Sequence, residues 1–498
     1  GVARFTNGYK LFMPTEFMHG MYDQGHGAGL EDFWNNYKSH PLFVGGFMWD
    51  FCDNAVKRVD KGGVLDSDGF NAPDGILGPY REKEGSYYTV RDIWAPIQVD
   101  RFFVTPSFDG RFFVTNDYLY TSLDSCRMTY ALYKIDSPLS GGKGRRTVMA
   151  EGEVKLPSLC PGERGIATMA LPENFFDADV LEMVAYHPDG REMVTRTWNV
   201  GYARDYWNRH RADASTAGKA VCEKNGNVVK LAAAGVEVTF DTTTGYITQV
   251  LSNGHHISLS NGPVPVGMVA SVKSSSARLD GDTAVFAVKY HGNIDSIVWR
   301  MAPDGLLDMQ MVMLNRSRLG GGLDDAASYE NITNLGITFS YPESAVTGMR
   351  WLGGGPYRVW KNRLRGANVG LWEKAYNNTI TGESYENLIY PEFKGYHSNL
   401  YWATVQSKES DFTVFATSDG VYLRMLTPEE PHARQGTERT MPAFPEGDIS
   451  FLLEIPAIRS FKPISQHGPK SQPGTIRIKS GDEGIFMGLG FDFRTTAK

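Results

Sequence analysis

Glu16 and His19 are the first residues of this 498-residue chain whose types and spacing point to chemistry. Glu16 lies near the end of a short apolar run at 10–17. A carboxylate at the C-terminal end of a parallel strand is where β/α barrels place catalytic groups. His19 lies three residues later, close enough to face the same pocket. A structural interpretation stays open, in which Glu16 bonds the backbone of a neighbouring loop.

Residues 1–95 contain two β/α units that would position these side chains. Strand-like apolar runs at 10–17 and 43–51 alternate with stretches of helical spacing at 30–40 and 84–94. Alternating strands and helices predict parallel pairing. Two units are too few to bury a parallel sheet on both faces, so we expect this segment to be the end of a larger fold.

The rest of the chain is predicted to be all-β. Period-two runs separated by turn residues fill 96–201, which predicts a β-sandwich of about 100 residues. Residues 202–219 are polar and are expected to form an irregular linker. Alternating strands and Asn-Gly or Asp-Gly turns continue through 220–498, which predicts a large second sandwich.

Composition argues against several classes of protein. Hydrophobic residues make up 41% and charged residues 21%, as in packed globular proteins, and the length suggests about three domains. The net charge of -7 argues against nucleic-acid binding, and no apolar run is long enough to span a membrane. The four cysteines match no metal or redox spacing.

Four motifs near the start of the chain carry a family resemblance. Glu16 opens the sequence Glu-Phe-Met-His-Gly-Met, and a Phe-Trp pair follows on the predicted helix. Gly-Gly-Phe-Met-Trp-Asp and Asp-Gly-Ile-Leu come next, in that order. The chain thereby resembles glycoside hydrolase family 2, and within it the β-galactosidases. The motifs lie at 16–21, 33–34, 45–50 and 74–81.

The resemblance implies a multidomain architecture. Residues 1–95 resemble the C-terminal part of a (β/α)8 catalytic barrel, and 96–201 resemble the immunoglobulin-like β-sandwich that follows it. Residues 220–498 resemble the family's large C-terminal β-sandwich, which is supersandwich-like. That last similarity is carried by Trp-Leu-Gly-Gly-Gly-Pro-Tyr at 351–357 and by Tyr-Pro-Glu at 390–392.

By the same resemblance, the chain is part of a retaining exo-β-glycosidase that hydrolyses terminal β-galactosides by double displacement. Glu16 would be the nucleophile, His19 and Trp49 would contact the sugar, and Asp74 would line the pocket. The family's acid/base glutamate belongs to an Asn-Glu motif, and no such motif stands before Glu16. We therefore expect the chain to be incomplete and inactive alone, with a missing N-terminal half as its partner.

The other expected partner is a β-linked oligosaccharide or glycoside, with no nucleic acid and no membrane span. The resemblance allows a structural or active-site cation. Asn71 and Asp74 are the nearest matches to the family's sodium-site region. The sequence at 70–74 differs from the family's, so we assign no metal ligands there. A periplasmic or secreted bacterial location is compatible with the family alone.

Departures from the family pattern leave alternatives open. The loop at 22–29 is longer than in the galactosidase pattern, which leaves a glucuronide or a mannoside open as the substrate. A different class of function is a non-catalytic carbohydrate-binding or assembly module with a barrel remnant. His19 and Trp49 also have structural interpretations. His19 could hold its loop in place, and Trp49 could pack in the core of the barrel. An Asn-Glu motif on a barrel strand encoded upstream of residue 1 would favour the enzyme over the non-catalytic module.

Overall fold

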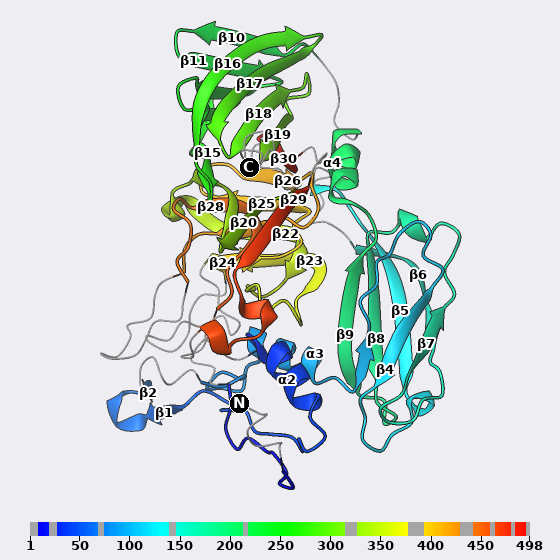
Figure 1. The fold of residues 1–498 in the computed structure, drawn as a ribbon. Coiled ribbons are helices and arrows are strands. Elements are labelled where there is room, and N and C mark those ends of the chain that lie inside the picture. The colour runs from blue at the N-terminus through cyan, green and yellow to red at the C-terminus, as the bar shows by residue number, and fades with distance from the viewer. Residues whose placement is uncertain are drawn as a thin grey trace.

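The computed structural model consists mainly of antiparallel β-sheets, with three α-helices in its described part (Figure 1). The structure describes residues 8–18, 27–67, 74–138, 146–212, 218–313, 326–376, 393–428, 442–458, 464–479 and 484–494. The alternating sequence pattern predicts this dominance of strands. No helix in these ranges has the length and the apolar composition that crossing a membrane requires.

Two short helices form in the N-terminal region where the spacing of apolar residues predicts them. They are α2 (Leu30–Lys38) and α3 (Gly85–Ile93). Acidic residues lie in the first turn of α2 and Lys38 lies in its last turn, which complements the dipole of the helix. Both helices turn apolar side chains toward the same cluster of buried residues.

The strands predicted at 10–17 and 43–51 are reduced to isolated parallel bridges between the two segments. Their parallel direction agrees with the β/α pattern of the sequence. An antiparallel hairpin that the sequence analysis did not predict follows them, formed by β1 (Ala55–Arg58) and β2 (Val64–Ser67). A complete barrel strand is therefore absent from the described residues of this region.

The next part of the chain forms a seven-stranded antiparallel sheet in the order β3-β4-β7-β6-β5-β8-β9. The long strand β6 pairs with both β5 and β7, so the sheet folds around one hydrophobic core in a sandwich-like way. The strands are β3 (Ile97–Val99), β4 (Arg111–Asn116), β5 (Arg127–Ile135), β6 (Arg146–Lys155), β7 (Arg164–Met169), β8 (Val180–Tyr186) and β9 (Glu192–Asn199).

Two larger antiparallel sheets form the rest of the described chain and share a second core. Aromatic side chains fill it, and the Trp299 ring lies 5.2 Å from Phe240 and 5.7 Å from Phe491. We call these two sheets the large sandwich and the seven-stranded sheet the small sandwich. The predicted domain boundaries themselves stay predictions.

The ten-stranded sheet of the large sandwich contains β10 (Val221–Asn225), β11 (Val228–Ala233), β12 (Val236–Asp241), β13 (Ile247–Ser252), β14 (His255–Ile257), β15 (Ser260–Val266), β21 (Leu335–Ser340), β24 (Gly395–His397), β27 (Tyr422–Met425) and β28 (Ile449–Glu454). The nine-stranded sheet contains β16 (Ala270–Asp280), β17 (Thr283–Gly292), β18 (Ile294–Met301), β19 (Leu307–Met313), β22 (Val346–Gly355), β23 (Asn368–Ala375), β25 (Trp402–Ser407), β26 (Phe412–Ala416) and β30 (Ile485–Asp492). A separate pair is formed by β20 (Ala326–Ile332) and β29 (Gly474–Lys479).

The prediction of an irregular linker over 202–219 is wrong in its first half, which forms the helix α4 (Ala203–Ala212). Trp207 and His210 are buried against the large sandwich. The indole of Trp207 lies over Gly490, where an added Cβ atom would be 2.6 Å from the ring. The charged side chains of the opposite face made this stretch resemble a linker, whereas tertiary packing of one face stabilises the helix.

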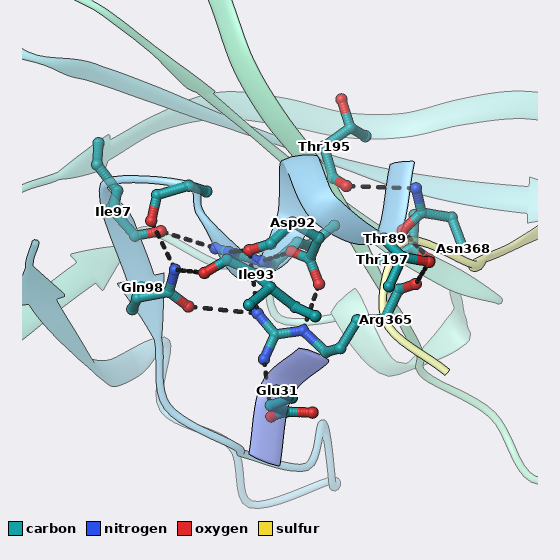
Figure 2. A network of polar contacts seen from close by, with 12 residues as sticks. Glu31, Thr89, Asp92, Ile93, Ile97, Gln98, Thr195, Thr197, Arg365 and Asn368 are labelled. Atoms are coloured by element: carbon teal, nitrogen blue, oxygen red, sulfur yellow. Dashed lines mark hydrogen bonds and ion pairs between the residues drawn. The ribbon is translucent and has the colours of Figure 1, made fainter. Parts of the chain in front are cut away.

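A buried carboxylate, Asp92 of α3, connects the N-terminal helices to both sandwiches (Figure 2). Arg196 of β9 donates from Nε to Asp92 Oδ1 at 2.6 Å, and Arg365 bonds the other oxygen from the chain between β22 and β23. Arg365 also reaches Glu31 of α2 at 3.3 Å and Gln98 of β3 at 3.2 Å. Burial alone would raise the pKa of Asp92, but the two guanidinium groups hold it below its usual value.

The substitution Asp92→Asn should lower the free energy of unfolding by about 3 kcal/mol, because two guanidinium groups lose the buried anion that they share. Calorimetric melting curves measure the effect as an earlier transition. The matched control is Asp60→Asn, whose ion pair with Arg58 is exposed and which should leave the curve unchanged. Identical curves for both variants would contradict the role of Asp92.

Candidate active site

Three segments of the N-terminal region run parallel and place their ends side by side. The backbone N–H of Phe17 donates to Phe47 O at 3.0 Å, and that of Phe47 donates to Pro14 O at 3.0 Å. On the other side, Cys52 forms a parallel bridge with Leu77. Isolated bridges thus join the three segments in the order of the chain, and we call this arrangement, which contains no regular strand, the small parallel sheet.

Helices α2 and α3 cover one face of this sheet. Phe17, Leu30, Tyr37, Val90 and Ile93 are buried together there, in a cluster separate from the cores of the two sandwiches. The rings of Phe17 and Tyr37 meet edge to face at 5.7 Å. Glu16, on the N-terminal side of Phe17, is exposed, whereas Met18 on its other side packs against the same cluster.

The opposite face of the sheet is apolar and exposed. Leu11, Met13, Phe47, Trp49 and Phe51 each expose between 44% and 68% of their surface. A concentration of large exposed apolar side chains marks a surface that binds a ligand or another polypeptide. We call it the open face.

Glu16 and Trp49 lie at neighbouring positions beside the open face. Glu16 is exposed and directly precedes Phe17, which bridges Met48, and Trp49 directly follows Met48. The backbone N–H of Trp49 donates to Phe17 O at 3.4 Å. The bridged backbones therefore place Glu16 and Trp49 on adjacent segments, one position before and one position after the bridged pair. Such a pair suits a sugar, whose ring stacks on an aromatic face while a carboxylate faces its anomeric carbon.

Asp74 lies on the next segment. Its carbonyl oxygen accepts the backbone N–H of Asp50 at 2.8 Å, directly after Trp49, and its side chain is 6% exposed. His19, the fourth predicted site residue, lies outside the described residues. The structure thus places three of the predicted residues on three adjacent segments. Their roles stay predictions.

A buried carboxyl that the sequence analysis missed lies beneath these segments. Asp53 is 4% exposed and its Oδ1 accepts the backbone N–H of Gly75 at 3.0 Å. Burial raises the pKa of Asp53 to about 7, with smaller increases from Glu82 and Asp50, while hydrogen bonds from Gly75 and with Glu84 oppose the rise. The available signal was an acidic residue two positions after the end of the apolar run predicted at 43–51.

The described residues include no group of three or more His, Cys, Asp or Glu side chains placed to hold a metal ion. Asn71, one of the two residues nearest to the family's sodium-site region, lies outside the described residues. Asp74 alone does not make a cation site.

The pH dependence of stability tests the state of Asp53. A carboxyl with a pKa of about 7 in the folded protein and 3.8 as its ordinary value stabilises the fold most at low pH. This contribution should disappear as the pH rises from about 4 through about 7. Asp53→Asn, which imitates the protonated acid, should remove this loss.

Melting temperatures of the wild type and of Asp53→Asn, measured across this pH range, give the comparison. The difference between them should shift in favour of the variant as the pH rises. Asp109→Asn, at an exposed turn, is the matched control and should follow the wild type. Parallel curves for wild type and Asp53→Asn would show that folding does not raise the pKa of Asp53.

Comparisons with known proteins cover up to 81% of the chain. A family model described as β-galactosidase small chain matches residues 266–425, within the large sandwich. β-Galactosidase 2 of Enterobacter cloacae is 22% identical over 401 residues, which cover 69% of this chain and 36% of that protein. β-Galactosidase BgaC of Bifidobacterium adolescentis is 21% identical over 443 residues, which cover 80% of this chain and 39% of that protein.

The β-galactosidase of Priestia megaterium is similar in extent, with 20% identity over 439 residues that cover 81% of this chain and 40% of that protein. The chain therefore spans less than half the length of these curated relatives. The shared name of the relatives and the matched family model support a β-galactosidase-related family for this chain, within the glycoside hydrolases.

Proposed function

We propose that this chain is part of a retaining exo-β-glycosidase that hydrolyses terminal β-galactosides, with Glu16 as its nucleophile. The observation that carries the proposal is the placement of Glu16 and Trp49 beside one open face, with Asp74 on the adjacent segment. The β-galactosidase names of the relatives supply the substrate class. The resemblance to glycoside hydrolase family 2 supplies the mechanism.

In this mechanism, the Glu16 carboxylate attacks the anomeric carbon and forms a covalent glycosyl-enzyme. A second carboxyl group about 5–5.5 Å away protonates the departing glycosidic oxygen. The same group then takes a proton from water, which attacks the anomeric carbon and releases the sugar with retained configuration. Trp49 supports the apolar face of the ring, and His19 hydrogen-bonds its hydroxyl groups.

The layering of the N-terminal region supports its assignment to the C-terminal part of a (β/α)8 barrel. Barrel helices pack on the outer face of the strands, while the inner face is buried among side chains of the other strands. Here α2 and α3 cover one face, and the apolar open face has no cover from the described residues. Two β/α units cannot close a barrel, so the remaining strands come from another polypeptide segment.

That missing segment also supplies the acid/base carboxyl in this proposal. The resemblance to glycoside hydrolase family 2 assigns that residue to an Asn-Glu motif on an earlier strand of the barrel. The partners are thus the remainder of the barrel and a β-linked glycoside. The competing function is a non-catalytic carbohydrate-binding or assembly module, which would have no use for a nucleophile at Glu16.

Glu16→Gln in the assembled enzyme should reduce the turnover of an aryl β-galactoside at least about a thousandfold, because an amide cannot form the glycosyl-enzyme. A 2-deoxy-2-fluoro galactoside with a good leaving group should label Glu16, which peptide mass spectrometry detects. Glu223→Gln, at an exposed position of β10, is the matched control and should keep full turnover.

Labelling of a different carboxylate would overturn the assignment of Glu16. The same preparation, assayed with an aryl β-glucuronide and an aryl β-mannoside, tests the sugar. Higher turnover of either substrate than of the galactoside would assign another β-glycoside, without affecting the role of Glu16.

The 498-residue chain by itself should show no turnover of an aryl β-galactoside, because the open face and the acid/base position are both incomplete. Adding a polypeptide that carries the remainder of the barrel should restore hydrolysis. The assay compares the chain with and without that polypeptide, and Glu16→Gln serves as the control in each case. Turnover by the chain alone that Glu16→Gln abolishes would show that one of its own carboxyl groups is the acid/base.

A further inference from the structure

Two residues are inserted where the third segment of the small parallel sheet pairs with the second. The backbone N–H of Asp50 donates to Asp74 O at 2.8 Å, and that of Leu77 donates to Phe51 O at 3.2 Å. Asp50 and Phe51 are neighbours in the chain, whereas Asp74 and Leu77 are three positions apart. The two residues between Asp74 and Leu77 therefore have no counterpart on the second segment and form a bulge.

Each residue of this bulge, Gly75 and Ile76, makes one specific hydrogen bond. The backbone N–H of Gly75 donates to Oδ1 of Asp53 at 3.0 Å, and Ile76 O accepts the backbone N–H of Glu84 at 3.4 Å. Glu84 directly precedes α3, so the second bond connects the bulge to that helix. The N–H of Gly75 is buried, and a buried N–H without an acceptor is strongly unfavourable, so the bulge depends on Asp53.

The backbones on the two sides of this contact touch each other. A Cβ atom added at Gly75 would lie 2.3 Å from the carbonyl carbon of Cys52 and 2.4 Å from the backbone nitrogen of Asp53. The side chain of Asp53 is 4% exposed, and its other near neighbours are the acidic residues Asp50, Glu82 and Glu84. The bond to Gly75 requires no particular protonation state, because the acid and the carboxylate both have an oxygen that carries no hydrogen.

The segment that Asp53 holds in this way carries Asp74, which directly precedes the bulge. The carbonyl oxygen of Asp74 bonds the residue that directly follows Trp49. A displacement of the bulge would therefore move Asp74 relative to Trp49. Glu16 lies on the first segment, which pairs with the second through backbone bonds of Phe17 that do not involve the bulge.

We propose that Asp53 is a positioning residue of the Glu16 site, which acts through Gly75 to hold Asp74 beside Trp49. This inference rests on the proposed function, since Asp74 and Trp49 contact a sugar only in that proposal. Contacts along the wall and floor of a pocket bind the substrate and the transition state alike, so their displacement raises KM and leaves kcat nearly unchanged.

Kinetics of the assembled enzyme with an aryl β-galactoside test the inference. Asp53→Leu, whose side chain has a similar size but accepts no hydrogen bond, should raise KM about tenfold and leave kcat within about twofold. Asp53→Asn should keep the wild-type KM, because its carbonyl oxygen can accept the N–H of Gly75. An unchanged KM in Asp53→Leu, or the same rise in Asp53→Asn, would overturn the inference.

A general loss of stability is controlled by Asp304→Leu. Asp304 is 5% exposed and its Oδ1 accepts the backbone N–H of Leu306 at 3.0 Å, in the turn between β18 and β19. Figure 1 shows these two strands far from α2 and α3. This variant loses the same kind of bond, so its melting temperature should fall while its KM stays at the wild-type value. A KM raised as much as in Asp53→Leu would show that destabilisation alone explains the effect.

A double-mutant cycle tests whether Asp53 acts through Asp74. Asp74→Ala removes the contact that Asp53 is inferred to position. The KM of the double variant Asp53→Leu/Asp74→Ala should therefore equal that of Asp74→Ala alone. Effects of the two substitutions that multiply would show that Asp53 acts by another route and would overturn the inference.

Hydrogen exchange of the 498-residue chain tests the bond to Gly75 without any turnover. The Gly75 amide should exchange at least about tenfold faster in Asp53→Leu than in the wild type or Asp53→Asn, as fragmentation mass spectrometry measures. Equal rates would overturn the inference and leave the proposed function standing. Absence of turnover in the assembled wild type would overturn the proposed function, and with it the role of Asp53 in the reaction.

Discussion

The arrangement of the molecule depends on one buried anion, Asp92, held between Arg196 and Arg365. Desolvation of three charged groups opposes this arrangement, and close charge-assisted hydrogen bonds to both carboxylate oxygens offset it. Each group belongs to a different part of the chain: a helix of the N-terminal region, the small sandwich and the large sandwich. The orientation of α3 is therefore set by both sandwiches at once. Since α3 packs against the small parallel sheet, the same anion sets where Glu16 and Trp49 lie.

The large sandwich also approaches the candidate site directly. The backbone N–H of Gly29, at the start of α2, donates to Asn362 O at 3.0 Å. Asn362 is itself held by Ser471 at 2.9 Å, within the C-terminal part of the chain. Lys470 contacts the first turn of α2, where its backbone N–H donates to Asp32 at 3.0 Å. Distant segments of the large sandwich thus contact the start of α2, which gives this domain a structural role in holding that helix.

The open face and a cavity of about 170 Å³ beside α4 differ in how much of each is built by the described residues. The open face is a surface that the described residues leave uncovered, and its proposed function requires another polypeptide segment. The cavity beside α4 is built entirely by described residues, at the place where the helix connects the two sandwiches. Buried contacts of Trp207 and His210 hold that helix on the nine-stranded sheet.

The sequence by itself determined the dominance of strands and the two N-terminal helices, and it marked Glu16, Trp49 and Asp74 as candidate site residues whose roles stay predictions. These features are local, since the period of apolar residues and a short motif are both contained within a few turns or one strand. Only the tertiary structure decided that α4 is a helix, because its stability comes from the sheet that buries one face. It also decided the raised pKa of Asp53 and the position of Asp92. Asp92 and Arg365 are 273 residues apart, and no periodicity within one segment records a partner at that distance.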